Sequence, residues 1–84
     1  MRLPVIKHIH HFTKENDVDF LHETMELLEH LADSEALKDE EIDVIGEMMS
    51  NISGAIEVHK MIEDGADEKD ALNNFMKRVM GSID

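Results

Sequence analysis

The sequence predicts an all-α protein, a small antiparallel bundle of about four helices. Residues that favour helices dominate its 84 positions, with a single proline and few aromatic side chains. Apolar residues recur at steps of three and four, as they do along one face of a helix. We find no clear alternation of apolar and polar residues of the kind that half-exposed strands show. A chain of this length holds one core, so we expect a single helical domain over residues 1–84.

The first helix is expected over residues 4–14. Pro4 fits the first turn, where a missing N–H is not needed. The apolar residues Val5, Ile9 and Phe12 then recur at helical spacing and indicate the face that packs on the rest of the chain.

The second helix is expected over residues 17–32, with Asn16 or Asp17 capping its start. Its main apolar stripe consists of Val18, Leu21, Met25, Leu28 and Ala32. A neighbouring stripe, expected to widen the buried face, consists of Phe20, Thr24, Leu27 and Leu31. Ser34 can cap a short turn in the connection that follows.

The third helix is expected over residues 40–63 and is the longest, roughly 36 Å at 1.5 Å per residue. Acidic residues at its start suit the positive end of the helix dipole, and Gly65 suits its C-terminal cap. The fourth helix is expected over residues 67–80, capped by Asp67. Short connections between these segments predict antiparallel neighbours.

Small residues form a line on the third helix at Gly46, Ser50 and Gly54. Two glycines inside a helix cost about 1 kcal/mol each relative to alanine, so a compensating contact is expected. One interpretation is close packing of another helix, including that of a second subunit; the other is a break in the helix near Gly54. We therefore predict these three residues as a candidate dimer interface, which leucine at Gly46 or Gly54 should weaken.

The length of the third helix also favours a dimer. It exceeds the second by about eight residues, or roughly 12 Å, which the second helix cannot cover. Ile56, Val58 and Ile62 lie in this excess. The first helix, the fourth helix or a second subunit must therefore cover them.

Charge is distributed unevenly along the chain. The formal net charge is −12, which disfavours binding to nucleic acid or to anionic membranes. Residues 15–68 hold 18 acidic side chains against Lys38 and Lys60 only, while the two ends are slightly basic. One interpretation is an acidic partner of a basic protein, such as an inhibitor or a nucleic-acid mimic; the other is a solvated surface that keeps the protein soluble.

Histidine suggests two kinds of site. His22, Glu26 and His30 form an i, i+4, i+8 line that could chelate a divalent ion, but the line lies on an acidic, solvated face, and the Glu-x-x-His pairs of di-iron bundles are missing. We expect no metal site there. His59 falls on the apolar stripe of the third helix, either as a pH-sensitive group at an interface or as a partly buried residue paired with Glu63.

Catalysis finds little support in the sequence. Cysteine, tyrosine and tryptophan are absent, the four glycines are dispersed, and no serine belongs to a recognisable Ser/His/Asp set. We expect no enzyme, no catalytic residue and no cofactor. The longest apolar runs are two or three residues and no signal peptide is evident, which predicts a soluble cytoplasmic protein.

Three stretches carry a resemblance to a known family: MRLPVIKHIHHF at residues 1–12, DVIGEMMSNISGAIEVHK at 43–60 and ALNNFMKRVMGSID at 71–84. Together they resemble a small, acidic, all-helical bacterial family of unknown function. The resemblance implies a self-contained small protein and brings no catalytic or binding residue with it.

The sequence leaves three functional hypotheses. The first is a non-enzymatic, cytoplasmic protein that acts through protein contacts and forms a homodimer. The second is an acidic inhibitor or mimic that binds a basic protein, and the third is a small His/Glu metal-binding protein.

Overall fold

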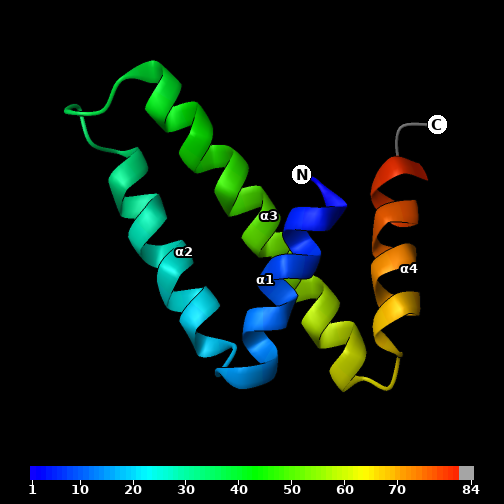
Figure 1. Cartoon of the computed structure of the whole chain (residues 1–84). Coiled ribbons are helices and arrows are strands. Elements are labelled where there is room, and N and C mark those ends of the chain that lie inside the picture. Colours follow the sequence, from blue (N-terminus) through cyan, green and yellow to red (C-terminus); the bar gives the residue numbers. More distant parts are fainter. Residues whose placement is uncertain (82–84) are drawn as a thin grey trace.

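Four α-helices make up the fold in the computed structural model, which describes residues 1–81. They are α1 (Leu3–Glu15), α2 (Asp19–Ala32), α3 (Asp39–Glu63) and α4 (Glu68–Gly81), and consecutive helices run in opposite directions (Figure 1). The predicted all-α class is confirmed. Each helix begins and ends within two residues of its predicted bounds.

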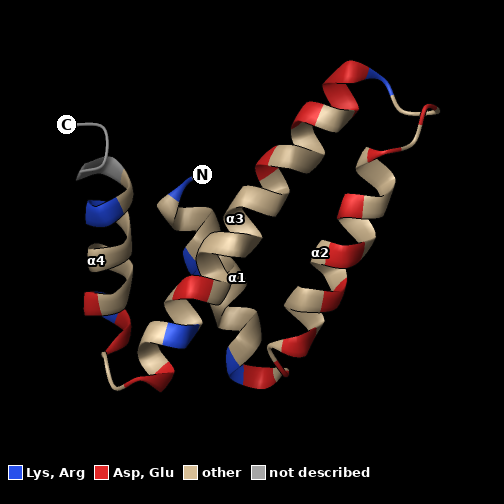
Figure 2. Cartoon of the chain, turned by 180° about the vertical axis from the view of Figure 1, so that it is seen from behind, with Lys and Arg blue, Asp and Glu red and all other residues tan. Residues whose placement is uncertain are grey.

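The long helix α3 is the element on which the others pack. α1, α2 and α4 each contact it, and α1 also contacts α4, whereas α1 meets α2 at the rings of Phe12 and Phe20 and not along its length. α2 runs beside the first half of α3, and α1 and α4 lie against its second half (Figures 1 and 2). The arrangement is flat, with Cα extents of 42 × 35 × 17 Å.

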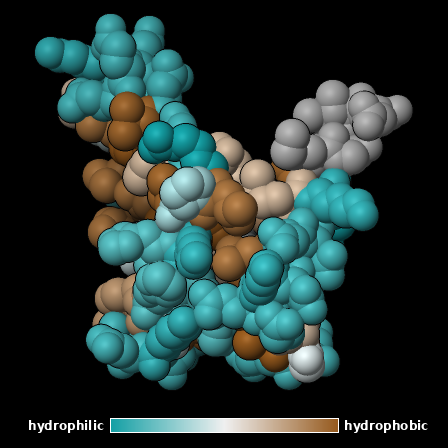
Figure 3. Space-filling view, turned by 45° about the vertical axis from the view of Figure 1, so that its right-hand side comes forward, coloured by the Kyte–Doolittle hydropathy of each residue, from teal (hydrophilic) through white to brown (hydrophobic). Residues whose placement is uncertain are grey.

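One end of this arrangement projects as an arm, which we define as residues 19–50: α2, the connection to α3 and the first three turns of α3. Its tip stands clear of α1 in Figure 1, and in Figure 3 it forms a hydrophilic lobe above a band of apolar side chains. The arm is therefore only two helices thick.

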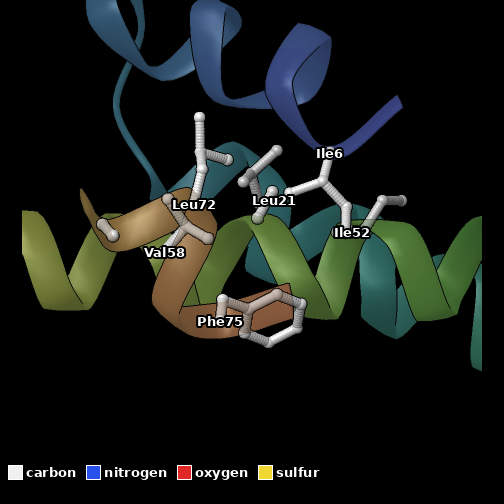
Figure 4. Close-up of a cluster of buried hydrophobic side chains, with 8 residues drawn as sticks. Ile6, Leu21, Ile52, Val58, Leu72 and Phe75 are labelled. Atoms are coloured by element: carbon white, nitrogen blue, oxygen red, sulfur yellow. The ribbon is translucent and has the colours of Figure 1, made fainter. Parts of the chain in front are cut away.

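The core lies where α1, α3 and α4 meet, with one residue from α2. Figure 4 shows this cluster, whose buried members are Ile6, Leu21, Ile52, Ala55, Val58, Ala71, Leu72 and Phe75. Val58 is fully buried, and Ile56 and Ile62 pack against the cluster, so the second half of α3 is covered within the chain.

The face of α1 that enters the core differs from the predicted one. Ile6 and His10 are buried, whereas Val5 and Ile9 are half-buried and Phe12 is exposed. The reason is that α1 contacts α3 and α4 together, so the residues that point between those two helices, Ile6 and His10, are the ones that lose contact with water.

Gly54 explains how the three helices can come so close. α3 is continuous through this residue, so the predicted break is wrong and close packing is the right interpretation. A Cβ atom at Gly54 would lie 2.9 Å from Cδ1 of Ile6 and 3.2 Å from the ring of Phe75. The close approach is therefore made by α1 and α4 of the same chain.

Glycine also ends α3, as predicted. Gly65 has a φ of 113°, a left-handed conformation that glycine adopts at little cost. Its N–H donates to the carbonyl of Ile62 at 3.0 Å, and the N–H of Ala66 donates to that of Met61 at 3.1 Å, the two bonds of a Schellman motif. Asp67 then caps α4 through its Oδ1, which accepts the N–H of Lys69 at 2.8 Å.

The starts of α2 and α3 use acidic side chains. Oδ1 of Asp17 accepts the N–H of Asp19 at 2.9 Å, and α2 begins two residues later than predicted because this turn precedes the helix. At α3, Oε1 of Glu41 accepts the N–H of Lys38 at 2.9 Å. Both carboxylates satisfy backbone donors that a helix start leaves free.

A buried amide fixes the start of α1. Arg2, the N-cap residue, donates its backbone N–H to Oδ1 of Asn51 at 2.8 Å, and Nδ2 of Asn51 donates to the carbonyl of Glu47 at 2.9 Å. Asn51 is fully buried, so both bonds are partly shielded from water. Asn51 of α3 thus accepts a backbone N–H at the start of α1, a role usually taken by a side chain next to the helix start.

The two glycines of α3 predict opposite effects on stability. Gly54→Leu should lower the free energy of unfolding by about 2–3 kcal/mol, because the side chain must displace Ile6 and Phe75. Gly46→Leu should raise it by about 0.5–1 kcal/mol, because a Cβ there meets no atom within 4 Å and leucine favours helix. Urea denaturation measures both; equal effects would contradict the close approach at Gly54.

Candidate interaction surface

The side of α3 that receives α1 continues, uncovered, beyond the end of α1. Met48 and Val44 lie one and two turns before the buried Ile52 on this side of the helix. Their exposed fractions are 36% and 58%. Two large apolar side chains therefore face solvent where the core face of α3 extends into the arm.

The neighbouring stripe of α2 is exposed too. Phe20, Thr24, Leu27 and Leu31 were expected to widen the buried face, and this expectation is wrong: Phe20 is 51% and Leu27 is 58% exposed. The stripe Val18, Leu21, Met25, Leu28 and Ala32 packs on α3 instead. Within residues 1–81, α1 reaches this second stripe at Phe20, whose ring meets that of Phe12, and no helix packs along the rest of it.

A groove joins these residues to α1. Its volume is about 670 Å³, and its apolar lining includes Ile9 and Phe12 from α1, Phe20 from α2 and Met48 from α3. The rings of Phe12 and Phe20 meet edge to face, with centroids 5.9 Å apart. The open face, as we call this surface, comprises Phe12, Phe20, Thr24, Leu27, Leu31, Val44 and Met48.

The open face is large for a chain of this size. A large apolar side chain has on the order of 150–200 Å² of surface, so these exposed fractions amount to roughly 500 Å² of apolar area. Figure 3 shows part of the apolar band below the hydrophilic tip of the arm. Patches of this size on small proteins commonly serve as binding surfaces.

Acidic residues surround the open face but are absent from it. Residues 19–50 hold eleven Asp and Glu and one basic residue, Lys38 (Figure 2). By helical spacing, Glu26 and Glu29 of α2 lie opposite the open stripe, while Glu23 and Glu41 stand near its edge. The surface is thus an uncharged strip with an acidic border.

The predicted interface residues do not share one surface. Gly46 is exposed on the side of α3 opposite the open face, Ser50 is half-buried, and Gly54 is buried under Ile6 and Phe75. The line of small residues therefore runs from solvent into the core of the chain itself.

The predicted histidine sites also have distinct positions. His59 is partly buried and its Nε2 lies 2.5 Å from Oε1 of Glu63, so the predicted pairing is confirmed. His22, Glu26 and His30 are all exposed on α2. Across residues 1–81, no group of three His, Asp or Glu side chains is arranged to hold a metal ion.

Sequence reasoning missed His10, which is 4% exposed at the junction of α1 with α3 and α4. Its ring centroid lies 6.4 Å from that of His59. The available signal was its position four residues after Ile6, on one face of α1. A second stripe of α1 with helical spacing is more apolar and was therefore predicted as the buried face; it consists of Val5, Ile9 and Phe12.

The comparison with protein families matches all 84 residues to a family of unknown function, DUF6952. The chain belongs to DUF6952. The predicted resemblance to a small family of unknown function is thereby confirmed. For this DUF6952 chain, no match is found among curated proteins or among solved structures. None of its helices within residues 1–81 is long and apolar enough to cross a membrane.

Adjacent leucines of α2 test the assignment of the open face. Leu28→Gln should lower the free energy of unfolding by about 2 kcal/mol, because Leu28 packs against the core cluster. Leu27→Gln should change it by less than about 0.5 kcal/mol, because Leu27 already faces water. The measurement is urea denaturation at a protein concentration low enough to keep the chain monomeric. A loss at Leu27 as large as at Leu28 would refute the open face.

Proposed function

We propose that the protein is a non-enzymatic cytoplasmic protein that acts through protein contacts and self-associates through the open face. The observation that carries this proposal is the exposure of Leu27, Val44 and Phe20 on one surface. Isolated exposed hydrophobic residues are ordinary, but a contiguous apolar strip beside a groove indicates a contact surface.

A second copy of the chain suits this surface for two reasons. First, the seven residues of the open face carry no charge, and Glu15 lies at the α1 side of the groove, so a twofold contact centred on those seven residues buries no unpaired carboxylate. Second, its roughly 500 Å² of apolar area would form the centre of an interface of ordinary size, about 800 Å² per partner. We assign the proposed contact to the open face rather than to Gly46, Ser50 and Gly54, because Gly54 is covered within the chain.

Sedimentation equilibrium at micromolar concentration tests self-association. Leu27→Glu and Val44→Glu should each weaken it by at least about tenfold, because each would bury an unpaired carboxylate. The matched control is Asn74→Glu, which adds the same charge at an exposed position on α4, outside the groove. A native protein that is monomeric at all concentrations, or equal weakening by all three variants, would refute the proposal.

The acidic border favours a second candidate function, binding of a basic protein. Eleven acidic residues in the arm would attract a lysine- or arginine-rich surface. Salt distinguishes the two candidates. From about 0.05 to about 0.5 M salt, self-association should tighten because repulsion between like copies is screened, whereas binding of a basic partner should weaken.

A further inference from the structure

Helix α1 is one wall of the open face, and its position depends on its packing against α3, the most extensive contact between two helices in residues 1–81, and on a smaller contact with α4. Ile9 and Phe12 line the groove from α1. The other side of the helix is held by Ile6, by His10 and by the bond from Arg2 to Asn51. Anything that loosens this inner side of α1 also displaces the wall of the groove.

His10 lies among other basic groups. Nδ1 of His10 is 3.2 Å from Oγ1 of Thr13, and the rings of His10 and His59 are 6.4 Å apart at an angle of 54°. The charged or titratable groups that act on it are Lys14 and His11 of α1, His59 of α3 and Glu68 of α4. Three of these four carry positive charge when protonated.

The fourth group, Glu68, is already engaged. Its Oε2 lies 2.8 Å from Nζ of Lys14, and its Oε1 lies 3.7 Å from Nε2 of His11. The hydrogen bond from Lys14 lowers the pKa of Glu68 and keeps this carboxylate ionised. Because Glu68 already interacts with Lys14 and His11, it compensates a proton on His10 only in part.

The surroundings of His59 add little further compensation. Its partner Glu63 lies on the solvent side, and His22, Lys60 and Asp64 border the same shallow groove. A proton on His10 must be accommodated between helices, away from water. His10 is therefore the imidazole whose protonation opposes the docking of α1.

We propose that the buried His10, which packs beside the ring of His59, is a pH-sensitive latch that holds α1 on α3 when neutral and releases it on acidification. Release removes Phe12 and Ile9 from the groove and so weakens the contact made through the open face. The latch itself stands on the geometry of the pair; its effect on association rests on the proposed function.

The direction in which docking of α1 depends on pH follows from the burial of His10. Desolvation lowers the pKa of His10 below 6.5, and Glu68 opposes this shift only in part. The released form of α1 exposes His10 and gives it an ordinary pKa, so it binds the proton more readily than the docked form. Docking is therefore at full strength above about pH 6.5 and weakens as the pH falls below that value.

Hydrogen exchange of the α1 amides tests the latch without reference to association. Between pH 7.5 and pH 5.5, after correction for the intrinsic exchange rate, protection of residues 7–15 should fall, by at most about tenfold for one histidine of ordinary pKa in the released form. His10→Gln should remove most of this fall, because glutamine cannot take up the proton. His8→Gln is the matched control, since His8 is exposed on the same helix, and should retain the full fall.

A second variant covers the case in which His10→Gln does not fold. His59→Gln removes one neighbouring imidazole and should reduce the fall in protection by less than His10→Gln does, because burial is the main cause of the lowered pKa of His10. A fall that is unchanged in His10→Gln, or unchanged in His59→Gln where only that variant folds, would overturn the latch.

Sedimentation at the same two pH values separates the latch from the proposed function. If the latch and the proposed function both hold, association weakens at pH 5.5 in the native protein but not in His10→Gln. A chain that is monomeric at both pH values, with α1 protection still lost on acidification, would support the latch and refute self-association.

Discussion

The structure depends on one constraint: α3 is longer than any helix available to cover it. It has 25 residues, whereas α1, α2 and α4 have 13 or 14 each. The chain concentrates α1 and α4 on the second half, where the missing side chain of Gly54 allows both to approach. Only α2 covers the first half of α3, and one side of the arm is therefore exposed to solvent.

The two features of greatest functional interest both result from the position of α1. Helix α1 begins at Leu3, and its N-cap residue Arg2 lies next to Asn51. The apolar side of α3 on the N-terminal side of Asn51 therefore faces solvent. Because α1 lies between α3 and α4, its inner face must bury whatever residue follows Ile6 by one turn, and that residue is His10. Helix α1 thus contributes both to the open face, through Phe12, and to the buried interior, through His10.

Helix positions were predictable from sequence because their signals are local: Pro4 in a first turn, Asp67 at a cap and Gly65 at a helix end. Which face of each helix is buried was not predictable, because periodicity shows that a stripe is apolar but not which other helix covers it. Leu27 and Leu28 belong to adjacent stripes of equal character, and only the placement of α1 decides that Leu27 remains exposed. Close packing at Gly54 was one of two interpretations that the sequence left open, and whether it came from within the chain or from a second subunit could not be predicted.

The bond between Arg2 and Asn51 has a consequence for synthesis on the ribosome. It joins residues 49 positions apart, and the core cluster unites Ile6 near the first residue with Phe75 near the last. Helices α1 and α2 emerge first but have no surface to pack on until α3 follows, and the site at Gly54 closes only with α4. The core can therefore close only once α4 has been synthesised, rather than forming stepwise as α1, α2 and α3 emerge.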